Sequence, residues 1–133
     1  MLSRRSILLI STAFLAGGGS AAAAASHPTA IKMFDTDGDG TIDLAEAKKA
    51  ASALFARLDR DHDGTLDKRE LAGRLSAREF AAADPDHDGT LTEGEYLAMV
   101  EARFNAANSD GDGTLDAKEL NARAGRALLH LMR

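Results

Sequence analysis

The stretch "DTDGDGTIDLAE", residues 35–46, alternates carboxylates with small residues and ends on a glutamate. Three later stretches repeat this pattern: "DRDHDGTLDKRE" at 59–70, "DPDHDGTLTEGE" at 84–95 and "NSDGDGTLDAKE" at 108–119. We call them loops 1 to 4. A unit that recurs at such a short period indicates four copies of one structural element.

Each loop fits the twelve-residue EF-hand consensus, except that Asn108 stands at the first position of loop 4. In this motif positions 1, 3 and 5 offer side-chain oxygens, position 7 a backbone carbonyl, position 9 an acid and position 12 a bidentate glutamate. The loops therefore predict four sites for a hard cation. The predicted ligands are Asp35, Asp37, Asp39, Thr41, Asp43 and Glu46 in loop 1; Asp59, Asp61, Asp63, Thr65, Asp67 and Glu70 in loop 2; Asp84, Asp86, Asp88, Thr90 and Glu95 in loop 3; and Asn108, Asp110, Asp112, Thr114, Asp116 and Glu119 in loop 4.

The acidic residues are concentrated in these loops. Of the 21 in the chain, only Glu79 and Glu101 lie elsewhere. A solvated acidic surface would spread its charge, so the concentration supports metal binding over chance matches. The chain has no cysteine, which excludes disulfides, zinc–thiolate sites and thiol catalysis. No nucleophile–base arrangement or phosphate-binding loop is visible, and we expect no enzyme.

The spacers between the loops are short, at 47–58, 71–83 and 96–107. Twelve helical residues span roughly 18 Å, so one helix must leave one loop and enter the next. The first and third spacers have apolar residues at helical spacing and no breaker, and we expect one continuous helix in each. These helices would hold loops 1 and 2, and loops 3 and 4, at opposite ends.

The middle spacer carries two signals for a reversal. Gly73 favours a helix end, and Ser76 with Glu79 forms a capping box that starts a helix. We expect two short helices with a break near Leu75 and Ser76. Loops 2 and 3 would then pair, as would loops 1 and 4, through β-bridges at the apolar position 8. The predicted fold is all-α: a compact EF-hand protein, a small helical bundle with paired loops at both ends, closed by one amphipathic helix after Glu119.

The first residues predict export. Arg4 and Arg5, an apolar run and small residues up to Ala25 are typical of a secretory signal peptide. "SRRSILL" fits twin-arginine export as well as the general route. We expect residues 1–25 to be removed and residues 26–133 to form one four-EF-hand domain in the periplasm. Without the two arginines, 14 basic and 21 acidic residues leave a net charge of −7. Such a charge argues against nucleic acid or, after cleavage, a membrane as partner.

Loop chemistry alone makes calcium the default ion. However, loops 1, 2 and 3 each contain five acidic residues. These extra carboxylates favour a trivalent ion electrostatically, whereas the stronger hydration of such an ion opposes binding. Charge counting therefore leans towards a trivalent ion without deciding the choice.

A resemblance bears on this choice. The short spacers, the third loop "DPDHDGTLTEGEY", and the segments "GRLS" and "VEARFNAAN" are similar to the lanmodulin family, periplasmic lanthanide-binding proteins of methylotrophic bacteria. The resemblance covers residues 31 to 133 and includes the spacers. It implies selective binding of lanthanide(III) ions with Ca2+ as a weaker ligand, and metal-induced folding. It also implies a role in lanthanide handling, with a lanthanide-dependent dehydrogenase or an uptake system as partner.

The chain departs from the family pattern at position 2, where that pattern has proline in every loop. Only Pro85 is present, and Thr36, Arg60 and Ser109 occupy the other three positions. Because Asn108 removes a charge, we expect site 4 to be the weakest. Two alternatives remain open at this point: a periplasmic calcium buffer or sensor, and an interaction module in which calcium is only structural.

Overall fold

The computed structural model describes residues 28–133. The predicted signal peptide, residues 1–25, lies outside them. In chain order the elements are α1 (Pro28–Phe34), β1 (Ile42–Asp43), α2 (Leu44–Leu58), β2 (Thr65–Leu66), α3 (Ala77–Ala83), β3 (Leu91–Thr92), α4 (Glu93–Ala107), β4 (Thr114–Leu115), α5 (Ala117–Asn121) and α6 (Arg123–Leu129). Every strand has only two residues, and the predicted all-α EF-hand fold is confirmed.

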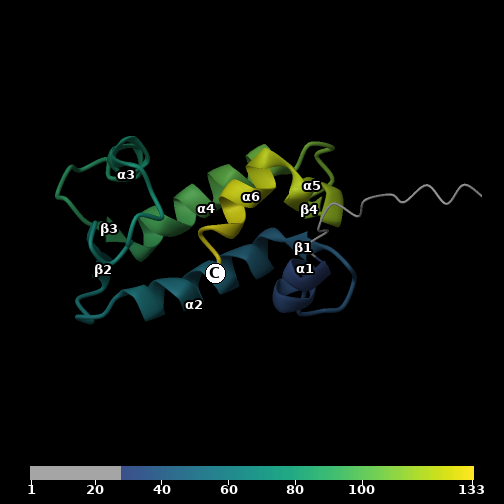
Figure 1. Cartoon of the computed structure of the whole chain (residues 1–133), viewed down its shortest axis with the longest axis horizontal. Coiled ribbons are helices and arrows are strands. Elements are labelled where there is room, and N and C mark those ends of the chain that lie inside the picture. Colours follow the sequence, from purple (N-terminus) through teal and green to yellow (C-terminus); the bar gives the residue numbers. More distant parts are fainter. Residues whose placement is uncertain (1–27) are drawn as a thin grey trace, which may run out of the picture.

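The two long helices connect the loops as predicted. α2 runs without interruption from loop 1 to loop 2, and α4 runs from loop 3 to loop 4 (Figure 1). Each begins with a capping box, from Asp43 to Glu46 and from Thr92 to Glu95. Their apolar stripes are buried and the two helices pack against each other. Because each helix has a loop at both ends, the helix pair holds the four loops in two groups.

The loops pair in the predicted combination. β1 pairs antiparallel with β4, with Ile42 opposite Leu115, and β2 pairs antiparallel with β3, with Leu66 opposite Leu91. All four position-8 side chains are fully buried. The loop pairs therefore lie at opposite ends of the molecule (Figure 1).

The middle spacer is only partly as predicted. The break at Ser76 is confirmed, because its side chain caps Glu79 in a complete capping box at the start of α3. The expected helix before it is wrong: residues 68–73 form hydrogen-bonded turns. Ala72 (φ 49°) and Gly73 (φ 77°) are both left-handed, which a continuing α-helix does not permit. The reversal therefore begins directly after loop 2.

The single C-terminal helix is also wrong. The chain breaks at Ala122 (ψ 163°), which separates α5 from α6. At Gly125 the backbone of α6 lies directly on the end of α5, where a Cβ atom would come within 2.5 Å of the Leu120 Cα. Glycine allows this close approach, and the fold at Ala122 turns α6 back along α4, against which it packs.

The core lies between the two ends. The rings of Phe55 on α2 and Tyr96 on α4 meet edge-on with centroids 5.7 Å apart. The Tyr96 hydroxyl donates a hydrogen bond of 2.8 Å to the Leu131 carbonyl. Aromatic packing thus joins the long helices, and a buried hydrogen bond attaches the C-terminal segment to them. Within residues 28–133, no helix combines the length and hydropathy that crossing a membrane requires.

Candidate metal sites

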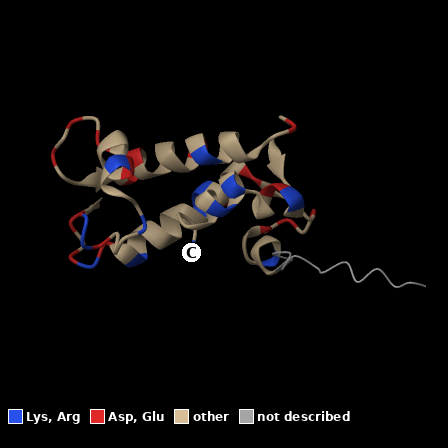
Figure 2. Cartoon of the chain, turned by 45° about the horizontal axis from the view of Figure 1, so that its top comes forward, with Lys and Arg blue, Asp and Glu red and all other residues tan. Residues whose placement is uncertain are grey.

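The acidic residues gather in the loops at both ends of the molecule, whereas basic residues occur on the helices as well as in loop 2 (Figure 2). Several of the loop acids are buried, which is uncommon for unpaired carboxylates. The buried acids are Glu46, Asp59, Glu70, Asp84 and Glu119, with 4–9% of their surface exposed. Three of them, Glu46, Glu70 and Glu119, are the position-12 residue of their loops.

The position-1 aspartate of loops 1 to 3 is oriented by the glycine at position 6. The amide of Gly64 donates to Asp59 Oδ2 at 3.0 Å, and loops 1 and 3 repeat this bond at 2.9 and 3.0 Å. Position 6 has φ between 83° and 86° in all four loops, where glycine avoids the strain that a Cβ would cause. In loop 1 this turn brings the aspartates at positions 1, 3 and 5 together.

Three loops bring three carboxylates together with ligand atoms within 4.8 Å of one another. The groups are Asp35, Asp37 and Asp39 in loop 1; Asp59, Asp61 and Glu70 in loop 2; and Asp84, Asp86 and Glu95 in loop 3. Oxygen donors at this spacing suit a hard cation. The groups in loops 2 and 3 include the position-12 glutamate, whereas the group in loop 1 does not.

Loop 4 differs from the others at its first position. Asn108 Oδ1 is fully buried and has no hydrogen-bond partner, the only such side-chain atom among residues 28–133. A buried amide oxygen without a donor costs free energy, and a bound cation would supply its missing partner. Asn108 therefore fits a ligand role, although no group of three carboxylates within 4.8 Å forms in this loop.

The position-9 residues act as helix caps. Asp43, Thr92 and Asp116 each accept a hydrogen bond from the backbone amide at position 12 of their loop, and the position-12 glutamate bonds back. Asp67 makes the same pair of bonds in loop 2. Threonine can replace aspartate here because the cap needs one acceptor oxygen. One oxygen of each position-9 aspartate is thus engaged in capping.

Crowding of carboxylates perturbs the acid at position 3. The pKa of Asp37 is raised: the amide of Asp39 lowers it, but burial, the hydrogen bond shared with Asp35 and the charges of Asp39 and Glu46 outweigh that amide. The pKa of Asp61 is raised by the same balance. In loop 3 the hydrogen bond with Asp84 is the largest cause that raises the pKa of Asp86. A cation at these sites would relieve this repulsion.

Two residues near the sites were not predicted to have a role. Thr36 and Ser109, at position 2 of loops 1 and 4, hydrogen-bond the position-12 glutamates Glu46 and Glu119. The signal was present in the sequence, since both residues carry a hydroxyl where Arg60 and Pro85 do not. By the family pattern alone, the two residues are only departures from proline.

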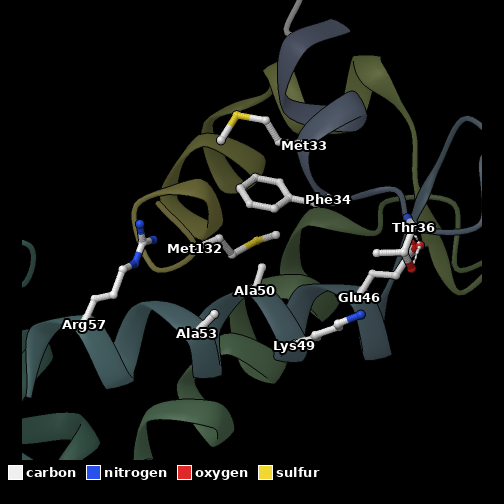
Figure 3. A pocket seen from close by; sticks show the side chains of 9 residues that line it. All are labelled: Met33, Phe34, Thr36, Glu46, Lys49, Ala50, Ala53, Arg57 and Met132. Atoms are coloured by element: carbon white, nitrogen blue, oxygen red, sulfur yellow. Dashed lines mark hydrogen bonds between the residues drawn. The ribbon is translucent and has the colours of Figure 1, made fainter.

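A pocket of about 240 Å³ opens beside loop 1 between α1 and α2. Phe34, Ala50 and Met132 contribute to its apolar walls. Its only acid, Glu46, turns its carboxylate to Thr36 (Figure 3). The pocket therefore lacks the donors of a further metal site.

Comparison with known proteins agrees with this geometry. The EF hand family model matches residues 29–49 and 52–76, which include loops 1 and 2. Lanmodulin from Methylorubrum extorquens strain AM1 is 51% identical over 76 residues, which cover 57% of this chain. The same alignment spans 57% of that relative's own length.

The loop pairs, the oxygen donors and these two matches lead to one assignment. EF-hand loops bind metal ions through such donors, and the described residues place these donors in the turns that the motif requires. The chain folds as an EF-hand protein with metal-binding loops, and it is similar to lanmodulin over 57% of its length.

Proposed function

We propose that the protein is a periplasmic binder of trivalent lanthanide ions that holds them in its four loops. The single observation that carries this proposal is the 51% identity to lanmodulin, which belongs to the family whose spacers and third loop this chain resembles. The metal ion is the cargo of this protein and not a cofactor of a reaction. We propose a binding role rather than an enzyme activity.

Charge supports the choice of ion. Loops 1, 2 and 3 each have five acidic residues, so a divalent ion leaves each site at about −3 and a trivalent ion at about −2. The carboxylate groups of loops 1 to 3 already have oxygen atoms within 4.8 Å of one another, so negative charge is crowded there. A trivalent ion relieves more of this repulsion. Calcium remains the weaker ligand of the same oxygen donors.

Export and partners extend the proposal. A signal peptide at residues 1–25, removed through the general or the twin-arginine route, would deliver residues 26–133 to the periplasm. There the loaded protein would store its ion, or pass it to a lanthanide-dependent dehydrogenase or an uptake system. Pull-down from periplasmic extract with and without lanthanum(III) tests this step, and a partner retained only by calcium would instead favour a structural interaction module.

Competition between ions tests the proposal. We expect lanthanum(III) or terbium(III) to bind the metal-free protein in the presence of a large excess of calcium and to drive its helical change. Circular dichroism follows the fold, and emission from terbium reports binding. If micromolar calcium produces the full change and lanthanum(III) cannot displace it, the protein is a calcium buffer or sensor.

A further inference from the structure

The four position-12 glutamates differ in how their second oxygen is held. One oxygen, Oε2, accepts the position-9 amide in every loop, at 3.0, 3.1, 2.8 and 3.2 Å in loops 1 to 4. This bond belongs to the capping box and cannot distinguish the sites. In loops 1, 2 and 4 the other oxygen, Oε1, accepts hydrogen bonds from position 2 of the same loop. The residue at position 2 differs in all four loops.

In loops 1 and 4 the position-2 residue donates twice. Glu46 Oε1 accepts the Thr36 amide at 2.6 Å and the Thr36 hydroxyl at 2.9 Å. Glu119 Oε1 accepts the Ser109 amide at 2.8 Å and the Ser109 hydroxyl at 3.0 Å. The position-3 amide adds a longer contact of 3.4 Å in each loop. Figure 3 shows Glu46 reaching from the first turn of α2 to Thr36.

In loops 2 and 3 the position-2 residue donates fewer hydrogen bonds to the position-12 glutamate, or none. Glu70 Oε1 accepts only the Arg60 amide, at 3.0 Å. Pro85 has no amide hydrogen, and Glu95 Oε1 has no hydrogen-bond donor among the described residues. The number of donors from position 2 therefore falls from two in loops 1 and 4 to one in loop 2 and none in loop 3.

The positions of the four glutamate carboxylates agree with this difference in hydrogen bonding. Glu70 and Glu95 each lie with two aspartates of their own loop inside a 4.8 Å group, but Glu46 and Glu119 belong to no such group. Hydrogen bonds to a carboxylate are among the stronger ones in proteins. A glutamate that must bind an ion through both oxygens has to exchange such bonds for metal contacts.

We infer that Thr36 and Ser109 are positioning residues that hold the position-12 glutamates away from the ion, so that loops 2 and 3 fill before loops 1 and 4. This inference rests on the proposed function for the choice of ion, but its mechanism applies to any cation that the glutamate binds. Because the hydrogen bonds need the folded chain, they act on the sites that are still empty once the fold has formed. Pro85 gains a role here, since it removes the amide donor opposite Glu95.

The order of filling can be read for each site by NMR. The protein is titrated with lanthanum(III) in a metal-buffered solution, and the amide signal of the position-6 glycine reports each loop. The reporters are Gly40, Gly64, Gly89 and Gly113. We expect the signals of loops 2 and 3 to reach their bound positions first. Simultaneous response of all four loops would overturn the inference.

Substitutions at position 2 test the cause. Thr36→Val keeps the shape of the side chain and removes the hydroxyl, and we expect about tenfold tighter binding at loop 1. Thr29→Val removes a hydroxyl from an exposed position on α1 and is the matched control. Arg60→Thr places a hydroxyl donor at position 2 of loop 2, and Arg60→Val places a side chain of the same shape without the hydroxyl. We expect the threonine variant to bind lanthanum(III) less tightly at loop 2 than the valine variant. Pro85→Ala restores an amide donor opposite Glu95 and should lower the affinity of loop 3.

The outcomes separate the two proposals. Unchanged or weaker binding at loop 1 in Thr36→Val, together with equal affinities of the two Arg60 variants at loop 2, would contradict the positioning role and leave lanthanide binding intact. If lanthanum(III) binds none of the loops, the proposed function fails. The same titration with calcium then still measures the order of filling and the effect of each substitution.

Discussion

At the scale of single residues, Gly125 has the least room for a Cβ atom among the glycines of residues 28–133. A Cβ atom there would meet backbone atoms of Glu119 and Leu120, which cannot rotate away as a side-chain tip could. We expect Gly125→Ala to lower the free energy of unfolding by about 1–3 kcal/mol, the usual cost of overpacking. Urea unfolding with saturating metal, followed by circular dichroism, measures it.

Gly94 is the matched control for this substitution. It lies in the first turn of α4, and the nearest atom to an added Cβ is the Thr92 hydroxyl oxygen at 3.8 Å. Alanine there meets no obstacle and lowers the entropy of the unfolded chain, so Gly94→Ala should add about 0.5–1 kcal/mol. Equal changes in the free energy of unfolding at the two positions would show that the close contact at Gly125 does not destabilise the alanine variant.

Tyr96, the only tyrosine of the chain, titrates late because it is fully buried. Burial raises its pKa from 10.0 to about 12, although Arg74 and Arg103 oppose this shift. A raised pKa means that the contribution to stability is complete below pH 10 and is lost as the pH rises through about 12. We expect the phenolate absorbance to appear around pH 12 in the folded protein.

The unfolded protein provides the reference for this titration. In guanidinium chloride the same absorbance should appear near pH 10, the ordinary value for tyrosine. Phenolate formation near pH 10 in a sample whose circular dichroism is still native would contradict the buried position of Tyr96.

At the scale of elements, α3 depends on its N-cap residue, Ser76. Ser76 accepts the Glu79 amide at 3.2 Å, and its own amide donates to Glu79 at 2.7 Å, so the capping box satisfies two donors. Ser76→Ala should reduce stability by about 1 kcal/mol, whereas Ser76→Gly should cost only a few tenths. Denaturant unfolding of both variants tests the cap; equal losses would exclude a capping effect.

The elements that could be predicted are those with local causes. The continuous helices follow from unbroken periodicity, the start at Ser76 from its capping box, and the loop pairing from the spacer lengths. The break at Ala122 could not be found this way, because it goes with a tertiary contact, the packing of Gly125 on the Leu120 backbone in the folded chain. The turn at Ala72 likewise depends on where the chain must reverse.

The metal sites also combine features that the sequence predicts with features that depend on the folded structure. The donor residues and their grouping in loops 1 to 3 follow from motif positions, and these positions are the same in every protein that carries the motif. The hydrogen bonds of Glu46 and Glu119 were not predicted, since they depend on side-chain rotamers and on hydroxyls at a position that the motif leaves unspecified. The different hydrogen bonding of the four position-12 glutamates therefore needed the structure, whereas the charge that Asn108 removes from loop 4 did not.

At the scale of the whole molecule, buried negative charge opposes folding of the metal-free chain. Five loop acids have less than 10% of their surface exposed, and neither disulfides nor a large core compensates. We expect the metal-free protein to lose most of its helix and metal binding to restore it, since binding free energy becomes folding free energy. Far-UV circular dichroism with and without a chelator decides; a strong helical signal after complete metal removal would contradict metal-coupled folding.

The two long helices have a consequence for any set of four bound ions. Each has 15 residues and is therefore roughly 22 Å long, and each carries a binding loop at both ends. The loops joined by a β-bridge place their ions side by side, whereas the other pair is a full helix away. Luminescent or paramagnetic ions would thus form two close pairs, one at each end of the long helices. The two ions within a pair would interact strongly, and ions in different pairs would be nearly independent.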